Sequence, residues 1–120
     1  MMKYRNLAEE VLNSTNQRWR VLAILCNKKV VSIALNNLEK THPSMKDFNP
    51  KRRTHAEIRC IRKTPKTKLM NSVMYVWRIN RKGVICASRP CKICETNIRK
   101  AGIKRVFFIN QSGQIDSITR

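Results

Sequence analysis

The sequence lacks an apolar segment long enough to cross a bilayer. Its longest uninterrupted apolar run, from Val21 to Cys26, contains six residues, whereas a membrane-spanning helix needs about 20. The sequence also shows no apolar region of the kind found in a secretory signal peptide. We therefore expect a soluble, intracellular, cytoplasmic protein with no membrane partner. Its 120 residues suit one compact domain, residues 1–120, and leave no room for a second.

Acidic residues are scarce. Seven Asp and Glu stand against 26 Lys and Arg, which gives a formal net charge of +19 at pH 7. A small domain with this balance attracts polyanions strongly. The charge alone does not identify the polyanion, because Lys and Arg occur in every third of the chain and much of the charge can belong to an ordinary solvated surface.

The five cysteines do not indicate a disulfide framework, because an intracellular compartment keeps thiols reduced. Only Cys91 and Cys94 stand in a C-x-x-C pair. The sequence lacks the second C-x-x-C that a four-cysteine structural zinc site needs. Cys26, Cys60 and Cys86 lie alone in apolar or helical stretches, and we expect them to be structural thiols.

Hydrophobic periodicity predicts five strands and three helices. The expected helices cover residues 3–13, residues 54–64 and residues 91–101, of which the last is ended by Gly102. The expected strands cover residues 20–26, 30–35, 72–79, 84–87 and 104–110. The first and second strands, and the third and fourth, are spaced as hairpins. Strands interleaved with helices predict an α/β fold in which helices cover a single sheet.

The most informative pattern is His55-Ala56-Glu57, followed after 32 intervening residues by Pro90-Cys91-Lys92-Ile93-Cys94. One imidazole and two thiolates supply three tetrahedral positions on Zn²⁺ and leave the fourth open for water, as in a catalytic zinc site. Cysteines in the first turn of a helix are favoured as thiolates by the positive end of the helix dipole. We therefore predict Zn²⁺ as the cofactor, with His55, Cys91 and Cys94 as its ligands.

Glu57 is predicted to be the catalytic acid and base. Hydrolysis at such a site needs one carboxylate that moves protons without taking the position of the water. A structural alternative remains open, because Thr54-His55-Ala56-Glu57 also has the form of a capping box. In that motif the Glu57 carboxylate would accept a hydrogen bond from the backbone amide of Thr54.

The two motifs, in this order, resemble those of the zinc-dependent cytidine and deoxycytidylate deaminase superfamily, in the branch whose first ligand is histidine. The resemblance covers about residues 36–108 and includes the helix-to-strand step Gly102-Ile103-Lys104-Arg105-Val106. It implies a three-layer α/β/α sandwich with one mixed five-stranded sheet, and hydrolytic conversion of cytosine to uracil. It also implies that Asn36 binds the substrate sugar and that the backbone amide of Ala56 contacts the base.

The motifs leave three substrates open: a free cytosine nucleotide or nucleoside, cytosine in single-stranded DNA or RNA, and adenosine in tRNA. Nine Lys or Arg stand against two acids between residues 46 and 68, which favours single-stranded nucleic acid as the partner. Within this segment, Lys51, Arg52 and Arg53 are candidate phosphate contacts. Phe48 is a candidate stacking surface for a base.

Other residues favour other interpretations. Arg89 stands where polynucleotide cytidine deaminases carry the tryptophan of a Ser-Trp-Ser motif, and it suits contact with one substrate phosphate, which favours a free nucleotide. Tyr75 and Trp77 alternate with aliphatic residues along one strand face, so we assign them to the core. A further alternative is a non-catalytic nucleic-acid-binding protein with structural zinc, and the presence of Glu57 beside an open three-ligand site argues against it.

Overall fold

The computed structural model describes residues 2–14, 20–36, 55–80 and 82–119. The helices are η1 (Met2–Tyr4), α1 (Arg5–Asn13), α2 (Ala56–Lys63), α3 (Lys66–Leu69) and α4 (Lys92–Lys100). The strands are β1 (Arg20–Asn27), β2 (Lys29–Leu35), β3 (Val73–Ile79), β4 (Ile85–Cys86), β5 (Arg105–Ile109) and β6 (Ile115–Thr119). None of the helices in these ranges has the length and apolar character needed to cross a membrane.

The strands form one mixed sheet in the order β2-β1-β3-β5-β6, and β4 pairs with the end of β3. β1 and β2 form the expected antiparallel hairpin, in whose turn Lys28 has a positive φ of 69°. β3 and β4 form the second expected hairpin. β3 and β5 are parallel, and the chain between them includes α4, which makes the crossover that a parallel pair requires. These pairings confirm the mixed sheet.

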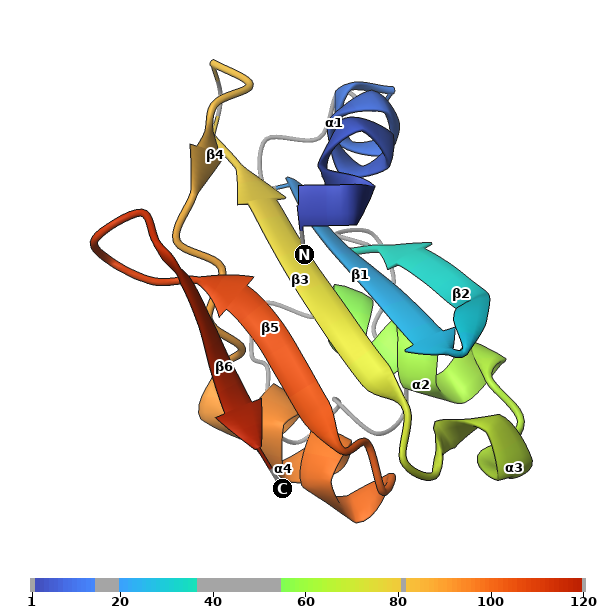
Figure 1. The fold of residues 1–120 in the computed structure, drawn as a ribbon. Coiled ribbons are helices and arrows are strands. Elements are labelled where there is room, and N and C mark those ends of the chain that lie inside the picture. The colour runs from blue at the N-terminus through green and yellow to red at the C-terminus, as the bar shows by residue number, and fades with distance from the viewer. Residues whose placement is uncertain (1, 15–19, 37–54, 81, 120) are drawn as a thin grey trace.

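Helices cover the sheet on both faces: α1 lies on one face, and α2 and α4 lie on the other (Figure 1). On the α1 face the core includes Leu12 of the helix, Ile24 of β1 and Trp77 of β3. On the opposite face Ile98 of α4 packs in a core with Val106 of β5. Alternate side chains of each central strand therefore enter two separate cores. This arrangement confirms the three-layer α/β/α sandwich and the core position of Trp77.

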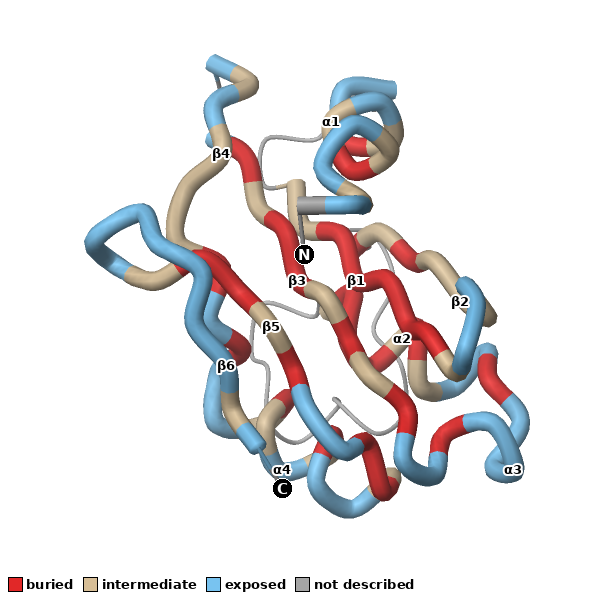
Figure 2. The backbone as a smooth tube through the Cα atoms, in the orientation of Figure 1, coloured by how far each residue is buried: buried red, intermediate tan, exposed pale blue. Residues whose placement is uncertain are grey.

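The sheet contains a sixth strand, β6, in addition to the five that the sequence predicts. β6 pairs antiparallel with β5 along its whole length. It is exposed beside the buried centre of the sheet, and only Ile118 is partly buried (Figure 2). An edge strand that is held by backbone hydrogen bonds and buries so little has no clear apolar alternation, and periodicity therefore does not reveal it.

The two helices that carry the motifs begin at the expected places. α2 starts after the N-cap residue His55 and ends before Pro65. His55 makes no side-chain capping bond, and Thr54, the first residue of the possible capping box, lies outside the described residues. α4 starts after the N-cap residue Cys91 and ends before Gly102, whose φ of 85° suits glycine. Each motif thus enters its helix at a predicted metal ligand.

We predict that Leu12→Ala lowers the free energy of unfolding by about 2–5 kcal/mol, because it opens a cavity beneath the helix that covers this face. Leu12 is fully buried. Urea unfolding followed by tryptophan fluorescence measures the change. Asn6→Ala, at an exposed position of the same helix, is the control and should change the value by less than about 0.5 kcal/mol. Equal effects of the two substitutions would contradict the described packing of α1.

Candidate metal centre

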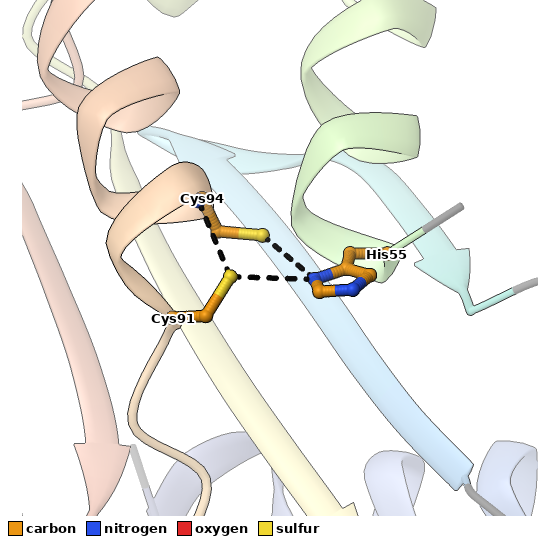
Figure 3. A group of neighbouring side chains, drawn as sticks. All are labelled: His55, Cys91 and Cys94. Carbon is orange, nitrogen blue, oxygen red and sulfur yellow. Dashed lines mark hydrogen bonds between the residues drawn. The ribbon is translucent and has the colours of Figure 1, made fainter. Parts of the chain in front are cut away.

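The two motifs meet at the N-termini of two neighbouring helices. α2 and α4 lie on the same face of the sheet and are in contact, and Ile58 of α2 packs against Cys94 of α4. His55 stands directly before α2, and Cys91 stands directly before α4 (Figure 3). Residues that are 36 positions or more apart in the chain are therefore brought to one place by helix packing.

The three predicted ligands have the spacing that a zinc ion needs. The Nδ1 atom of His55 lies 3.1 Å from the Sγ atom of Cys94 and 3.5 Å from the Sγ atom of Cys91. All three ligand atoms lie within 4.8 Å of one another. Tetrahedral Zn²⁺, with bonds of about 2.1 Å to nitrogen and about 2.3 Å to sulfur, separates a nitrogen and a sulfur ligand by about 3.6 Å. The group is therefore able to hold the ion with little movement.

The two sulfurs differ in their proton affinity. A hydrogen bond from the Cys94 thiol, with further help from His55 and the Cys94 backbone amide, lowers the pKa of Cys91 to about 4. The same contact, together with burial, raises the pKa of Cys94. The Cys94 amide nitrogen lies 3.5 Å from the Cys91 sulfur, as expected at a helix N-terminus. Cys91 is therefore the more acidic thiol of the pair.

Glu57 lies in the first turn of α2, and 4% of its surface is exposed. Burial raises the pKa of its carboxyl above the ordinary value, and its own backbone amide and the charge of His55 partly oppose this effect. Its side chain lines the same pocket as His55 and Cys91. A buried carboxyl next to metal ligands is typical of an acid–base residue, which is the role predicted for Glu57.

A pocket of about 350 Å³ is lined by two of the three predicted ligands, His55 and Cys91. The residues predicted to bind substrate, Asn36, Ala56 and Arg89, all line it. Its volume lies at the lower end of the range for small-molecule sites. Arg89 is exposed at the pocket, with its guanidinium 5.4 Å from the ring centroid of Phe108.

Asn36 is held firmly at the pocket wall. Its backbone amide donates to the Val21 carbonyl at 3.0 Å, and its side-chain oxygen accepts from the Val21 amide at 2.9 Å. Arg59 of α2 donates to the carbonyl of Leu35, the residue before Asn36, at 2.5 Å. The end of β2 is therefore tied both to β1 and to the helix that carries Glu57.

Four pocket residues were not predicted from the sequence: Val21, Ala87 and the two polar residues Arg78 and Ser88. The buried Ser88 hydroxyl donates to the Val76 carbonyl at 2.7 Å and accepts from the Ile109 amide at 2.9 Å. It thereby ties the segment before Pro90 to β3 and β5. Arg78 is the one charged residue of β3. That lone charge in an apolar strand is a signal that could have identified it.

The four residues predicted to contact nucleic acid lie outside the described residues. Phe48, Lys51, Arg52 and Arg53 all belong to residues 37–54, so their predicted contacts with nucleic acid stay predictions.

The three isolated cysteines take no part in the metal group. Across the described ranges, the single cluster of three or more His, Cys, Asp or Glu able to hold a metal is His55, Cys91 and Cys94. Cys26 and Cys60 are buried, and Cys86 is partly buried, each as a free thiol. Burial raises the pKa of Cys60 to about 12, which leaves it a protonated, unreactive thiol. The structural interpretation of these cysteines is therefore confirmed.

Comparison with known proteins identifies the family. The family model described as cytidine and deoxycytidylate deaminase zinc-binding region matches residues 1–110, which include both motifs. A search of curated proteins finds no match. The chain belongs to the cytidine and deoxycytidylate deaminase zinc-binding family. It is therefore a zinc-dependent deaminase with a His-Cys-Cys group able to hold the metal.

We predict that the purified protein binds one Zn²⁺ per chain and that Cys94→Ser loses most of this zinc. Its melting temperature should also fall, because the ion links two helices and contributes to folding. Elemental analysis and thermal unfolding measure the two effects. Cys86→Ser, at a partly buried thiol outside the group, is the control and should keep its zinc. Full zinc content in the Cys94→Ser protein would overturn the ligand assignment.

Proposed function

We propose that this protein converts cytosine to uracil by hydrolytic deamination, and that its substrate is single-stranded DNA or RNA. The family supports the deaminase chemistry. The observation that supports single-stranded nucleic acid as the substrate is that the catalytic pocket adjoins another cavity. It shares Arg78 and Ala87 with a second, larger cleft, on a chain with a net charge of +19. A pocket for one base that continues into another cleft suits a nucleotide within a strand.

The reaction replaces the exocyclic amino group of cytosine with the oxygen of water and releases ammonia. His55, Cys91 and Cys94 would hold the Zn²⁺ that lowers the pKa of a bound water to about 7. Glu57 takes a proton from the attacking water and delivers it to the ring nitrogen beside the attacked carbon. It then takes the second proton from the hydroxyl group added to the ring and delivers it to the amino group, which leaves as ammonia. The buried position of Glu57 keeps bulk water away from these proton transfers.

The remaining pocket residues position the substrate. Asn36 binds the sugar, and its bonds to Val21 fix the orientation of its side chain before the substrate arrives. The Ala56 amide contacts the base edge, because amides in the first turn of a helix have no acceptor within that helix. Arg89, exposed at the pocket, contacts the phosphate of the target nucleotide.

Deamination of a free cytosine nucleotide is the second candidate. The specific observation in its favour is the pair Arg78 and Arg89, which lines a pocket of about 350 Å³. Two guanidinium groups beside one small pocket suit the phosphate of a mononucleotide. The two candidates share the same chemistry and differ in how many phosphates the protein contacts.

Replacement of Glu57 tests the proton path. Glu57→Gln should retain zinc and reduce turnover by at least about 100-fold, because the amide keeps the shape of the side chain but cannot carry protons. Ammonia release and elemental analysis measure the two properties. Glu95→Gln, in the first turn of α4, is the matched control and should keep most of the activity. Substantial turnover by Glu57→Gln would assign Glu57 to a capping role instead.

The salt dependence of binding distinguishes the two substrates. A strand that contacts about five phosphates should show a slope of about −3.5 for log K against log salt, so raising salt from about 50 to 200 mM weakens binding roughly 100-fold. A mononucleotide should lose only a few-fold. Fluorescence anisotropy of a labelled single-stranded oligonucleotide measures the slope.

A triple substitution to Gln tests whether Lys51, Arg52 and Arg53 contact phosphates. Removing the charges of Lys51, Arg52 and Arg53 should flatten the slope by about 2 if each side chain contacts a phosphate. The control removes three exposed charges at the end of α2 and in α3, namely Arg62, Lys66 and Lys68. A slope that changes equally in both proteins would mean that Lys51, Arg52 and Arg53 make no specific phosphate contacts. A slope near zero in the unsubstituted protein would favour the free nucleotide.

A further inference from the structure

A second cleft, of about 1000 Å³, lies on the α1 face of the sheet and adjoins the catalytic pocket. Arg5 of α1, Ile85 of β4 and Ile115 of β6 are among the residues that line it. Arg78 and Ala87 line both cavities. The two cavities therefore lie on either side of one short stretch of protein surface, and a chain-like ligand bound in the first can continue into the second.

A row of aromatic rings lies on the same face of the sheet. Tyr75 and Phe107 are partners in the parallel pairing of β3 and β5, and their rings are stacked with centroids 5.4 Å apart. The ring of Tyr4 lies 5.1 Å from that of Tyr75. Cations flank the row: Lys3 lies 5.7 Å from the Tyr4 ring centroid, and Arg105 lies 5.8 Å from that of Phe107. The face thus combines stacking surface with positive charge.

The aromatic row is continuous with the cleft and borders an uncovered part of the sheet. Ile109, which lines the cleft, stands two residues after Phe107 on β5, so the two side chains share a face. No described helix lies over β5 and β6 on this face (Figure 1). Ser117, the partner of Phe107 on β6, is exposed, and Ile115 is 44% exposed. The partly buried ring of Phe107 therefore lies next to solvent.

We propose that the second cleft and the aromatic row form a track for single-stranded nucleic acid. The strand leaves the catalytic pocket at Arg78, crosses the cleft and stacks bases on Phe107, the ring of the row that lies next to solvent. The inference rests on the proposed function and says where nucleotides next to the target cytosine bind. Aromatic rings beside cations bind single strands without sequence preference, and a net charge of +19 attracts their phosphates. A second copy of the chain fits this face poorly, because it would bring two strongly cationic surfaces together.

The test compares Arg105→Gln and Phe107→Leu with Lys104→Gln as the matched control. Lys104 is the exposed neighbour of Arg105 and loses the same charge, but it precedes β5 and so stands outside the aromatic row. Fluorescence anisotropy at low salt gives the affinity for single-stranded oligonucleotides of about 3 and about 15 nucleotides. We expect Arg105→Gln and Phe107→Leu to weaken binding of the longer strand about tenfold and to leave the shorter nearly unchanged. Lys104→Gln should change either affinity by less than about threefold.

Zinc content and thermal unfolding show whether each variant is folded. If Phe107→Leu fails to fold, Arg105→Gln, at an exposed position, carries the test alone. The track would be overturned if Arg105→Gln and Phe107→Leu bound the longer strand with the same affinity as Lys104→Gln. So would a Phe107→Leu protein that dissociates from dimer to monomer in sedimentation while its affinity for the strand is unchanged, because a second copy would then cover the face.

Failure of the track and failure of the proposed function have different outcomes. If the protein binds the longer strand through Phe107 but deaminates none of its cytosines, the track is supported and the proposed substrate is wrong. A protein that deaminates the longer strand with affinity indifferent to Arg105 and Phe107 keeps the substrate and loses the track. A protein that does not bind the longer strand at all overturns both.

Discussion

Two helices begin side by side at one end of the sheet, and the candidate site depends on that meeting. The Nδ1 atom of His55, before α2, lies 3.1 Å from the sulfur of Cys94 in the first turn of α4. A shift of either helix by one turn, about 5.4 Å, would separate these atoms beyond the reach of one metal ion. The pairing of Ser88 with β3 and β5 and the contact of Ile58 with Cys94 hold the helices in this register.

The same meeting of helix ends supplies the electrostatics of the site. Hydrogen bonds from the Cys94 thiol, from His55 and from the Cys94 backbone amide at the start of α4 lower the pKa of Cys91 to about 4. The first turn of α2 holds Glu57, and burial there raises the pKa of its carboxyl. A thiol with a lowered pKa and a carboxyl with a raised pKa thus line the same small pocket. The two pKa values shift in opposite directions because Cys91 accepts hydrogen bonds at the start of α4, whereas Glu57 is deeply buried.

The outer edge of β3 explains why the catalytic pocket adjoins a second cleft. β5 pairs with the first residues of β3, from Val73 to Tyr75, and β4 pairs with Arg78 and Ile79 at its end. β4 and β5 therefore pair with different parts of the same edge of β3. Residues of β4 and of the turn after β5 line the second cleft, while Arg78 also faces the catalytic pocket. The catalytic pocket and the second cleft thus meet at Arg78, near the end of β3.

The sequence alone predicted the His55, Cys91 and Cys94 group, a carboxyl at Glu57 beside it and the α/β alternation of the chain, because each depends on local spacing. Cys91 and Cys94 fall within one helical turn, and His55 and Glu57 are two residues apart at a helix start. Only the tertiary structure decided that Arg78 and Ser88 line the pocket and that β6 completes the sheet. Those features depend on which strands pair and in what register, and contacts between distant segments leave no local period in the sequence.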